Sequence, residues 1–498
     1  MSRGGSYLAF DLGAESGRAI LGQIDDAQLS LTEVHRFANT PVLIPTAPGQ
    51  QTLHWDVPGL WREIKTGLAA AGAKYGSISG MGLDTWGVDF GLLDRNGALL
   101  ANPVHYRDSR TDGMMDAAFA RVPKAEIFAQ TGIQFMQLNS LYQLLALVQN
   151  DSPLLDMAET FLTMPDLFNF WLTGRKAAEF TNATTTQCYN PLQRDWAFPM
   201  LEKLGIPTTF FPEVVQPGSI LGPLRKDIAS EVDVPGMTVV TPACHDTGSA
   251  VAAVPATGAD FAWISSGTWS ILGVEVNEAV VNAQALAYNL TNEGGVNGTY
   301  RLCKNVMGMW PIQESLRMWN RAGQNYTYAD LAPLAQQAES FRFLIDPDHD
   351  DFLKPGDMPA RIRAFCRRTG QGEPENHAQI VRCVLESLAL KYRLVLENLE
   401  KLLERPLQPI HIVGGGSQNA LLNQFTADAT GKQVVAGPVE ATATGNILVQ
   451  ALALGNLASL QEGRALVRRT AELGIYEPGN RAQWDQAFGR FTEMLDAA

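Results

Sequence analysis

Apolar and polar positions in the first hundred residues alternate in a pattern that predicts strands, a helix and then strands again. Three successive strands are expected at Ser6–Leu12, Arg18–Ile24 and Leu29–Phe37. Apolar residues then recur at helical spacing, at Leu60, Ile64, Leu68 and Ala71, which predicts a helix from about Gly59 to Tyr75. The apolar segment Ile78–Leu83 and a strand at Val88–Leu93 follow it.

The middle of the chain, from Asp112 to about Pro235, is mostly helical in pattern. A second strand-rich region starts at Asp260, and a hinge is expected at the small, Pro/Gly-punctuated segment Ala250–Gly258. A long helix is predicted from about Asn376 to Leu403 because its apolar residues fall on one face. The remaining predictions are a strand at Pro409–Val413, a turn at Gly414–Gly416, a helix at Ala420–Thr430, a strand at Gln433–Ala436 and a helix at Thr442–Leu454.

Two similar strand–turn–strand segments lie about 250 residues apart, at Ala9–Gly22 and Ala262–Gly273. Each has a tight turn of small and hydroxyl residues between two apolar strands. Such turns expose backbone N–H groups without bulky side chains, as an anionic phosphate chain requires. Because the segments open two sequential halves of the chain, they predict a nucleotide held between two domains.

Composition narrows the classes of partner and location. A chain of 498 residues is long enough for two large lobes or three small units, at roughly 100–200 residues per domain. The net charge of −14 argues against nucleic acid and anionic membranes as partners. The sequence contains neither a signal-peptide h-region nor a run of 18 apolar residues, and its five scattered cysteines predict reduced thiols. We therefore expect a soluble, cytoplasmic protein.

Asp11 follows the apolar run Tyr7–Phe10, so its carboxylate is expected at the carboxyl end of a buried strand. Ligands of parallel sheets bind at that end. A carboxylate that faces a phosphate turn is suited to holding Mg²⁺, directly or through water. Taken alone, the residue also fits a turn-starting Asp, and the second hairpin favours the functional interpretation.

Asp246 lies in the segment Ala243–Ala250, directly after a predicted strand that ends at Pro242. The strand-to-helix turn would bring its carboxylate within reach of a substrate hydroxyl, as a general base requires. In phosphoryl transfer, positioning matters more than base strength, so an ordinary Asp suffices. The alternative role is a helix N-cap. His245, taken alone, fits a packed or supporting side chain better than a catalytic one.

Three further segments combine polar groups with glycine or aromatic residues. Val413–Asn419 (VGGGSQN) joins a strand to a helix and allows close backbone approach to a flat ligand, and it lacks the dinucleotide-binding fingerprint. Asp84–Phe90 (DTWGVDF) and Tyr106–Thr111 (YRDSRT) resemble carbohydrate sites, which pair an apolar platform with polar partners for hydroxyls. The side chains that fit such a site are Asp84, Trp86, Asp89, Arg107 and Asp108, and a buried ion pair or a cap is the alternative for the last two.

Taken together, these segments resemble the FGGY carbohydrate kinases, and the agreement covers nearly the whole chain. The motifs come in the family's order and also include VHRF, TNATTTQ, HDT, SSGTWS, NEGG and KNVMG. DTWGVDF with YRDSRT is specific, because glycerol and xylulose kinases differ there, and it is most similar to the branch that acts on L-rhamnulose. The resemblance implies an α/β, two-lobed actin-like ATPase fold, with nucleotide and sugar in the cleft between the lobes. It implies that residues 1–250 bind the sugar and carry the first phosphate turn, and that residues 251–498 bind the nucleotide.

The resemblance also implies roles for individual residues. Asp246 would be the catalytic base, and Asp11 would hold Mg²⁺ through water. The implied nucleotide contacts are Ala14, Glu15, Ser16, Gly17, Arg18, Thr268, Gln313 and Gly416. The implied sugar contacts are Gly87, His245, Asp246, Thr247 and Asn305. Glu15 departs from the family pattern, in which a small or hydroxyl residue is more usual at this place.

The implied reaction is the ATP-dependent phosphorylation of L-rhamnulose at O1, with a small-molecule ketose and ATP as the partners and a monomer or dimer as the assembly. A sister kinase for L-fuculose, L-xylulose or L-ribulose is the nearest alternative, because a methyl pocket discriminates by only about 1–3 kcal/mol. Two other classes are an actin-like ATPase without a sugar substrate and a catalytically inactive sugar sensor. The presence of both a base and a phosphate turn argues against the sensor.

Overall fold

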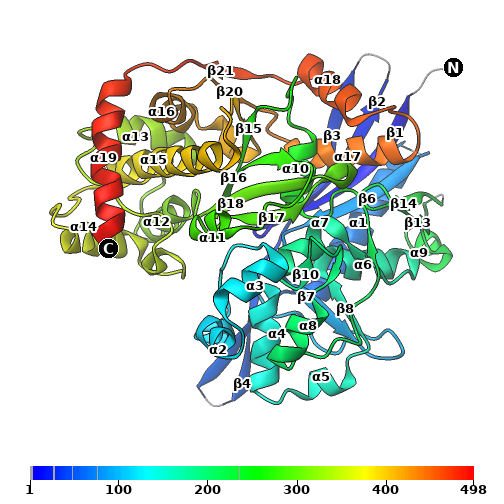
Figure 1. Cartoon of the computed structure of the whole chain (residues 1–498). Helices are drawn as coiled ribbons and strands as arrows, with labels where there is room; N and C mark the ends of the chain where they lie inside the picture. Colours follow the sequence, from blue (N-terminus) through cyan, green and yellow to red (C-terminus); the bar gives the residue numbers. More distant parts are fainter. Residues whose placement is uncertain (1–3, 26–27, 48, 76, 235, 498) are drawn as a thin grey trace. The chain divides into compact units, whose positions relative to one another are not determined.

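The computed structural model describes residues 4–497 except 26–27, 48, 76 and 235 (Figure 1). The chain divides into two compact units. Unit 1 consists of the chain up to Thr257 together with Glu275–Leu302 and Ala441–Thr470, and unit 2 consists of Gly258–Val274, Cys303–Glu440 and Ala471–Ala498. The chain therefore leaves and re-enters each unit more than once. The predicted division of roles between residues 1–250 and 251–498 stays a prediction.

A six-stranded sheet in the order β13-β14-β6-β1-β2-β3 organises unit 1. The three predicted N-terminal strands are present and antiparallel, and β1 also pairs in parallel with β6. In that register Asp11 lies opposite Asp84. The bounds are β1 Gly5–Leu12, β2 Ser16–Ile24, β3 Leu29–Ala38, β6 Gly80–Thr85, β13 Ile220–Pro223 and β14 Thr238–Val240.

Three helices of unit 1 position the site. α1 (Val57–Tyr75) buries the predicted apolar face, and its bounds are close to the predicted ones. α10 (Asp246–Ala252) and α17 (Ala441–Ala453) pack against each other, and α17 also contacts β1 and β6. A Cβ atom on Gly445 would lie 1.7 Å from the carbonyl oxygen of Ser249. Only glycine allows the two helices to approach this closely.

The middle of the chain contains short strands as well as the predicted helices. The strands are β4 Val42–Ala47, β5 Gln50–His54, β7 Phe90–Leu93, β8 Thr160–Thr163, β9 Ala178–Glu179, β10 Tyr189–Asn190, β11 Asp195–Trp196 and β12 Val214–Val215. The helices are α2 Met114–Arg121, α3 Lys124–Thr131, α4 Ser140–Gln149, α5 Pro153–Met157, α6 Met164–Thr173, α7 Phe180–Ala183, α8 Phe198–Leu204 and α9 Lys226–Glu231. Pro235, the approximate end of the predicted helical region, lies outside the described residues.

Unit 2 contains the second predicted hairpin and the predicted long helix. Its strands include the order β16-β15-β19-β20-β21. α15 (His377–Leu403) starts where the Asn376 side chain accepts a hydrogen bond from the backbone N–H of Gln379, and it ends at Glu404 in the left-handed conformation. The strand bounds are β15 Ala262–Ser266, β16 Ser270–Val276, β18 Tyr300–Val306, β19 Ile410–Val413, β20 Val434–Ala436 and β21 Gly474–Tyr476.

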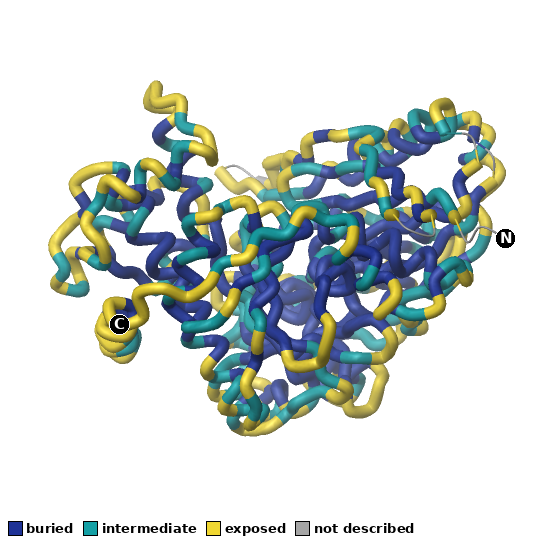
Figure 2. The backbone as a smooth tube through the Cα atoms, turned by 90° about the horizontal axis from the view of Figure 1, so that it is seen from above, coloured by how far each residue is buried: buried dark blue, intermediate teal, exposed yellow. Residues whose placement is uncertain are grey.

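Several other elements complete the chain. They are α11 Ala283–Ala287, β17 Thr291–Gly294, α12 Trp310–Arg321, α13 Leu331–Gln336, α14 Met358–Arg368, α16 Ala420–Thr430, α18 Leu460–Thr470 and α19 Arg481–Ala497. Within the described chain no helix is long and apolar enough to cross a membrane. All five cysteines are buried. Figure 2 shows the buried residues as continuous stretches of chain, with exposed residues gathered at loops and outer helical faces.

One local prediction is wrong, and a segment that was predicted as a hinge starts within a helix. The strand expected from Val88 starts at Phe90, because Val88 has a φ of 69° and cannot continue a strand. The segment predicted as a hinge, Ala250–Gly258, contains a boundary between the two units, at Thr257–Gly258. Its first three residues, Ala250–Ala252, form the last turn of α10, and the hinge itself stays a prediction. The small residues of this segment therefore reflect two things: the close packing of α10 against α17 and the boundary between the two units.

Candidate active site

The first hairpin turn is held in shape by Asn39, which is buried. The backbone N–H of Gly13 donates to the carbonyl of Ser16 at 2.9 Å and closes the turn. The Asn39 side chain donates to the Gly13 carbonyl at 2.9 Å, and its backbone N–H donates to the Glu15 carbonyl at 3.0 Å. Glu15 is exposed, and Ala14 and Ser16 are half-buried. The turn is thus a fixed loop whose backbone can approach a phosphate.

Two members of the predicted phosphate site meet directly. Arg18 Nη2 lies 2.6 Å from Asp11 Oδ2, and both side chains are largely buried. Gly17, next to Arg18, packs under the ring of Phe37, where a Cβ atom would lie 2.3 Å from that ring. The pairing places a guanidinium and a carboxylate at the end of β1, beside the turn.

Asp84 is fully buried next to Asp11. Burial raises its pKa well above the ordinary value, and the charges of Asp11 and Asp246 raise it further. Asn446 Nδ2 donates to Asp84 Oδ2 at 2.6 Å, whereas Oδ1 has no hydrogen-bond partner among the described residues. The carboxylates of Asp11, Asp84 and Asp246 therefore lie in one region of unit 1. At least one of their oxygens, Asp84 Oδ1, accepts no hydrogen bond from the described residues.

Asp246 is the first residue of α10, and His245 occupies the N-cap position. Its Oδ1 accepts hydrogen bonds from the backbone N–H and the hydroxyl of Thr247. Its Oδ2 makes no hydrogen bond with the described residues. Burial raises the pKa of Asp246, and His245 opposes this rise. The geometry leaves one carboxylate oxygen free to accept a proton.

His245 connects Asp246 to a buried ion pair. Its Nε2 lies 3.4 Å from Asp246 Oδ1 on one side of the ring. On the other side its Nδ1 lies 3.0 Å from Arg301 Nη2 and 3.2 Å from Glu293 Oε2. Arg301 and Glu293 are themselves 3.1 Å apart. These contacts join four charged or titratable side chains into one network, which consists of Asp246, His245, Arg301 and Glu293.

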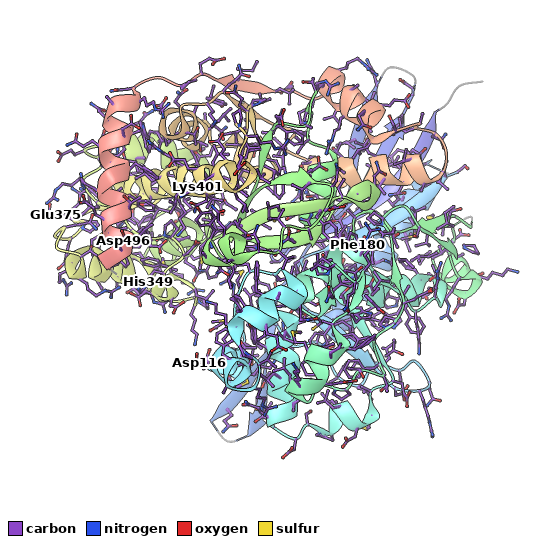
Figure 3. All side chains as sticks on the ribbon, viewed as in Figure 1. Asp116, Phe180, His349, Glu375, Lys401 and Asp496 are labelled. Atoms are coloured by element: carbon purple, nitrogen blue, oxygen red, sulfur yellow. The ribbon has the colours of Figure 1, made fainter. Side chains whose placement is uncertain are left out.

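The junction of β9 and α7 holds the backbone of His245 in place. Thr181 Oγ1 accepts from the His245 backbone N–H at 3.0 Å and donates to Glu179 Oε2 at 2.6 Å. Glu179 is fully buried, which raises its pKa to about 7. Phe180, labelled in Figure 3, begins α7 at this point. Thr181, the first residue of the TNATTTQ motif, thus connects the backbone of His245 to the buried Glu179 carboxylate.

Gly87 is placed against the 3₁₀ turn Thr184–Thr186, which follows α7. A Cβ atom on Gly87 would lie 2.9 Å from Thr185 Oγ1, and that hydroxyl also accepts from the backbone N–H of Val88 at 3.1 Å. Gly87 itself is half-buried. A side chain at this position would displace Thr185, so the backbone here is kept bare.

Two carboxylates predicted to fit a carbohydrate site serve the protein itself. Asp89 accepts from the indole N–H groups of Trp55 and Trp86 at 2.6 and 3.0 Å, and from Gln143 at 2.9 Å. Burial raises its pKa to about 6. Asp108 caps the turn at 109–111 and accepts from the Leu53 backbone N–H at 2.8 Å. The capping alternative is therefore correct for Asp108, and Asp89 supports the aromatic residues.

The predicted nucleotide residues of unit 2 surround the second hairpin turn. The carbonyls of Gly267 and Thr268 accept from the first N–H groups of α12 at 3.1 and 3.2 Å. Gln313 follows one turn later on α12, and its Oε1 is buried without a partner among the described residues. A Cβ atom on Gly416 would lie 2.1 Å from Ser266 Oγ. Asn305 lies near the end of β18.

The site residues thus form two sets, one in each unit. Asp11, Ala14–Arg18, Gly87 and 245–247 belong to unit 1, whereas Thr268, Asn305, Gln313 and Gly416 belong to unit 2. Among the described residues, no group of three or more His, Cys, Asp or Glu side chains has metal-binding geometry. Unit 1 also has a separate cavity of about 390 Å³, which none of the predicted site residues lines.

Sequence reasoning missed Arg301, Glu293 and Asn446 as site residues. Glu293 lay inside the quoted NEGG motif but was given no role. Arg301 lies 56 residues from His245, and Asn446 lies 362 residues from Asp84. A lone Arg in a strand and a lone Asn in a helix carry no local signal of such a partner.

Comparison with known proteins places this geometry in context. Residues 6–253 match the N-terminal domain of the FGGY family of carbohydrate kinases, and residues 262–454 match its C-terminal domain. A rhamnulokinase of Bacteroides thetaiotaomicron is 44% identical over 98% of this chain and 99% of its own length. A rhamnulokinase of Oceanobacillus iheyensis is 42% identical over 94% of this chain and 97% of its own length.

Solved structures show the same fold at lower identity. The ligand-bound xylulose kinase of Lactobacillus acidophilus has a TM-score of 0.79 and 17% identity, covering 99% of this chain and 98% of the other. The glycerol kinase of Plasmodium falciparum with ADP has a TM-score of 0.76 and 18% identity, covering 98% and 97%. The predicted α/β fold of the sugar kinases is confirmed.

Proposed function

Because this chain belongs to the FGGY family of carbohydrate kinases, we propose that it transfers the γ-phosphoryl group of ATP to O1 of L-rhamnulose. The product would be L-rhamnulose 1-phosphate, a step in L-rhamnose catabolism. Relatives that carry the name rhamnulokinase, 42–44% identical over nearly the whole chain, support this substrate. The nearest alternative is a sister ketose, and the experiment below distinguishes them.

The observation that carries the proposal is the asymmetry of Asp246. One of its oxygens is held by Thr247, and the other makes no hydrogen bond with the described residues. In the proposed reaction Oδ2 accepts the O1 proton while O1 attacks the γ-phosphorus in line with the leaving oxygen. Phosphoryl transfer has a loose transition state, so holding O1 in line matters more than the strength of the base.

We assign the remaining binding roles as follows. The backbone of the Ala14–Gly17 turn and the guanidinium of Arg18 contact the phosphate chain, with Glu15 at the exposed edge of that turn. Thr268, Gln313 and Gly416 contact the nucleotide, and the unpartnered Gln313 Oε1 supports this role because a buried amide oxygen needs a donor. Gly87, His245, Thr247 and Asn305 contact the sugar. Residues 1–250 would then bind the sugar and carry the first phosphate turn, and residues 251–498 would bind the nucleotide and contribute Asn305 to the sugar site.

The carboxylates of unit 1 fit a Mg²⁺ ion. Asp84 lies opposite Asp11, and its buried Oδ1 has no hydrogen-bond partner among the described residues. Burial raises the pKa of Asp84 most, and the negative charges of Asp11 and Asp246 raise it further, so a cation in this region would be stabilised by these carboxylates. Mg²⁺ is usually held by one or two carboxylates together with waters and phosphate oxygens. Asp11 would hold the ion through water. Bound there, Mg²⁺ offsets the charge of the phosphates.

The test is ADP release from Mg-ATP with a panel of ketoses and a blank without sugar. The panel contains L-rhamnulose, L-fuculose, L-xylulose, L-ribulose, D-xylulose and glycerol. We expect L-rhamnulose to give the highest kcat/KM by about tenfold, which corresponds to about 1.4 kcal/mol. A higher value for another ketose would overturn the substrate. Equal ADP release without sugar would favour an actin-like ATPase.

A further inference from the structure

We infer that Arg301 is a positioning residue for the phosphoryl transfer, because it fixes the tautomer of His245 and through it the orientation of Asp246. The inference rests on the proposed role of Asp246 as the base. It concerns two buried residues, Arg301 and Glu293, that the proposed reaction does not otherwise use.

The first step of the argument is the direction of one hydrogen bond. Arg301 Nη2 lies 3.0 Å from His245 Nδ1. A guanidinium nitrogen can only donate, so Nδ1 must accept, and the single ring proton of neutral His245 must then be on Nε2. The tautomer of this histidine is therefore set by the residue behind it.

Glu293 is the one described neighbour that could favour the opposite tautomer, since its Oε2 lies 3.2 Å from Nδ1. That oxygen is, however, 3.1 Å from Arg301 Nη2 and so has a cation beside it. A proton on Nδ1 would point towards the Arg301 N–H at 3.0 Å as well as towards Glu293. The side chains of Arg301 and Glu293 are only 0% and 4% exposed, so solvent does not weaken this conflict.

The second step concerns the other side of the ring. His245 Nε2 lies 3.4 Å from Asp246 Oδ1. With a proton on Nε2 this contact is attractive, whereas without one a nitrogen lone pair would face a carboxylate oxygen. Together with Thr247, the Nε2 proton holds Oδ1 and leaves Oδ2 for the substrate hydroxyl. Arg301 thus fixes which oxygen of Asp246 acts as the base.

Arg301 is itself well anchored for this task. Its Nε donates to the Gly294 carbonyl at 2.7 Å while Nη2 reaches Nδ1. A planar guanidinium can make both contacts from one rigid group, and a lysine ammonium cannot reproduce both. The strands β18, which carries Arg301, and β17, which carries Glu293, therefore set one fixed geometry.

The tautomer is measured by NMR on the full-length protein with ¹⁵N-labelled histidine. The chain has seven histidines, so the His245 signals are assigned by their loss in His245→Gln. We expect wild-type His245 to have a protonated Nε2 and an unprotonated Nδ1 near neutral pH. The opposite pattern, with a protonated Nδ1, would overturn the inference whatever the substrate is.

Two variants connect the tautomer to the rate. Arg301→Met removes the donor, and we expect a mixed or reversed tautomer together with a kcat lower by about 10- to 100-fold, as for other small misplacements of a catalytic group. Arg301→Lys keeps a donor and should restore the Nε2-protonated form and part of kcat. Arg36→Gln, which removes an exposed pair with Glu33, is the matched control with unchanged kcat.

ATP binding and thermal unfolding of each variant show whether it is folded. A folded Arg301→Met that keeps wild-type kcat on the best ketose would overturn the inference. If another ketose than L-rhamnulose is preferred, the proposed substrate fails while the tautomer and the kcat ratios still test Arg301. If no ketose is phosphorylated, the proposed function fails and, because it rests on Asp246 as the base, so does the role of Arg301.

Discussion

At the scale of single residues, the candidate site depends on carboxylates placed in different surroundings. Asp89 and Asp108 are surrounded by protein donors, so their oxygens are already used. Asp246 has one oxygen held and one free, and Asp84 has one oxygen without a partner among the described residues. The free oxygens mark where a substrate proton or a cation can be received.

Replacing Asp246 by Asn tests its role as the base. The amide keeps the shape and cannot accept the O1 proton, so we expect kcat to fall by about 10²- to 10⁴-fold. ATP affinity, measured by calorimetry, should stay close to that of the wild type because the nucleotide contacts are unchanged. A variant with near wild-type kcat would show that another group accepts the proton.

The same residue predicts a pH dependence. Burial raises the pKa of Asp246, so its carboxylate is protonated at a higher pH than an ordinary aspartate. A protonated base is inactive, and kcat/KM should therefore fall as the pH decreases through this raised pKa. Measured kcat/KM from acid to neutral pH should show the loss starting above the usual range of Asp. A loss confined to lower pH would contradict the burial effect.

At the scale of elements, the two hairpins and the long helix α15 were predictable because their patterns are local. Strand alternation and the small residues of the turns specify each hairpin, and apolar residues on one face specify α15. In the hairpin of β4 and β5 the apolar residues do not alternate between a buried and an exposed face of the strands. The sequence pattern therefore did not predict these two strands. Arg301 was missed because its partner His245 lies 56 residues away.

The first hairpin turn, which we propose contacts the phosphate chain, gives a prediction at this scale. Asn39→Ala removes the side-chain donor to the Gly13 carbonyl. The loss of this hydrogen bond destabilises the ordered conformation of the turn by about 1 kcal/mol. We expect KM for ATP to rise by roughly 3- to 10-fold with little change in KM for the ketose. Steady-state kinetics with each substrate varied in turn measures both values.

Asn96→Ala is the matched control. Asn96 lies in an exposed turn at 94–97, and its side chain donates a hydrogen bond to Asp94. Its kinetic constants should equal those of the wild type. An equal rise of KM for ATP in both variants would mean that the Asn39 contact does not shape the nucleotide site.

At the scale of the whole molecule, the C-terminal part of the chain completes unit 1. α17 packs on α10 and contacts β1 and β6, although it follows most of unit 2 in the sequence. Asn446 donates to Asp84, and Gln450 Nε2 donates to the Leu8 carbonyl at 3.1 Å. Asp246, the proposed base, begins α10, which packs against α17, so we expect a change in this packing to affect the candidate site.

A substitution at Gly445 tests how much the packing of α17 on α10 contributes to stability and activity. In Gly445→Ala the added Cβ atom would meet the Ser249 carbonyl, and overpacking of this kind costs about 1–3 kcal/mol. We expect a lower Tm and a lower kcat, measured by calorimetry and by ADP release. Gly489→Ala is the control, because Gly489 lies in α19 and, among the described residues, the added Cβ would meet no atom within 4 Å apart from the adjacent backbone of its own helix. Alanine also favours the helix. Equal Tm values for both variants would contradict the close approach.

The hydrogen bond between Asp84 and Asn446 spans 362 residues of chain, and this has a consequence for how the protein is made. A ribosome that adds about 5–20 residues per second needs roughly 20–70 s to pass from one partner to the other. During that time β1 and β6 have been synthesised, but the helix that covers them has not. The sheet surface that α17 covers in the folded protein therefore stays without this helix until about the last sixty residues of the chain begin to emerge.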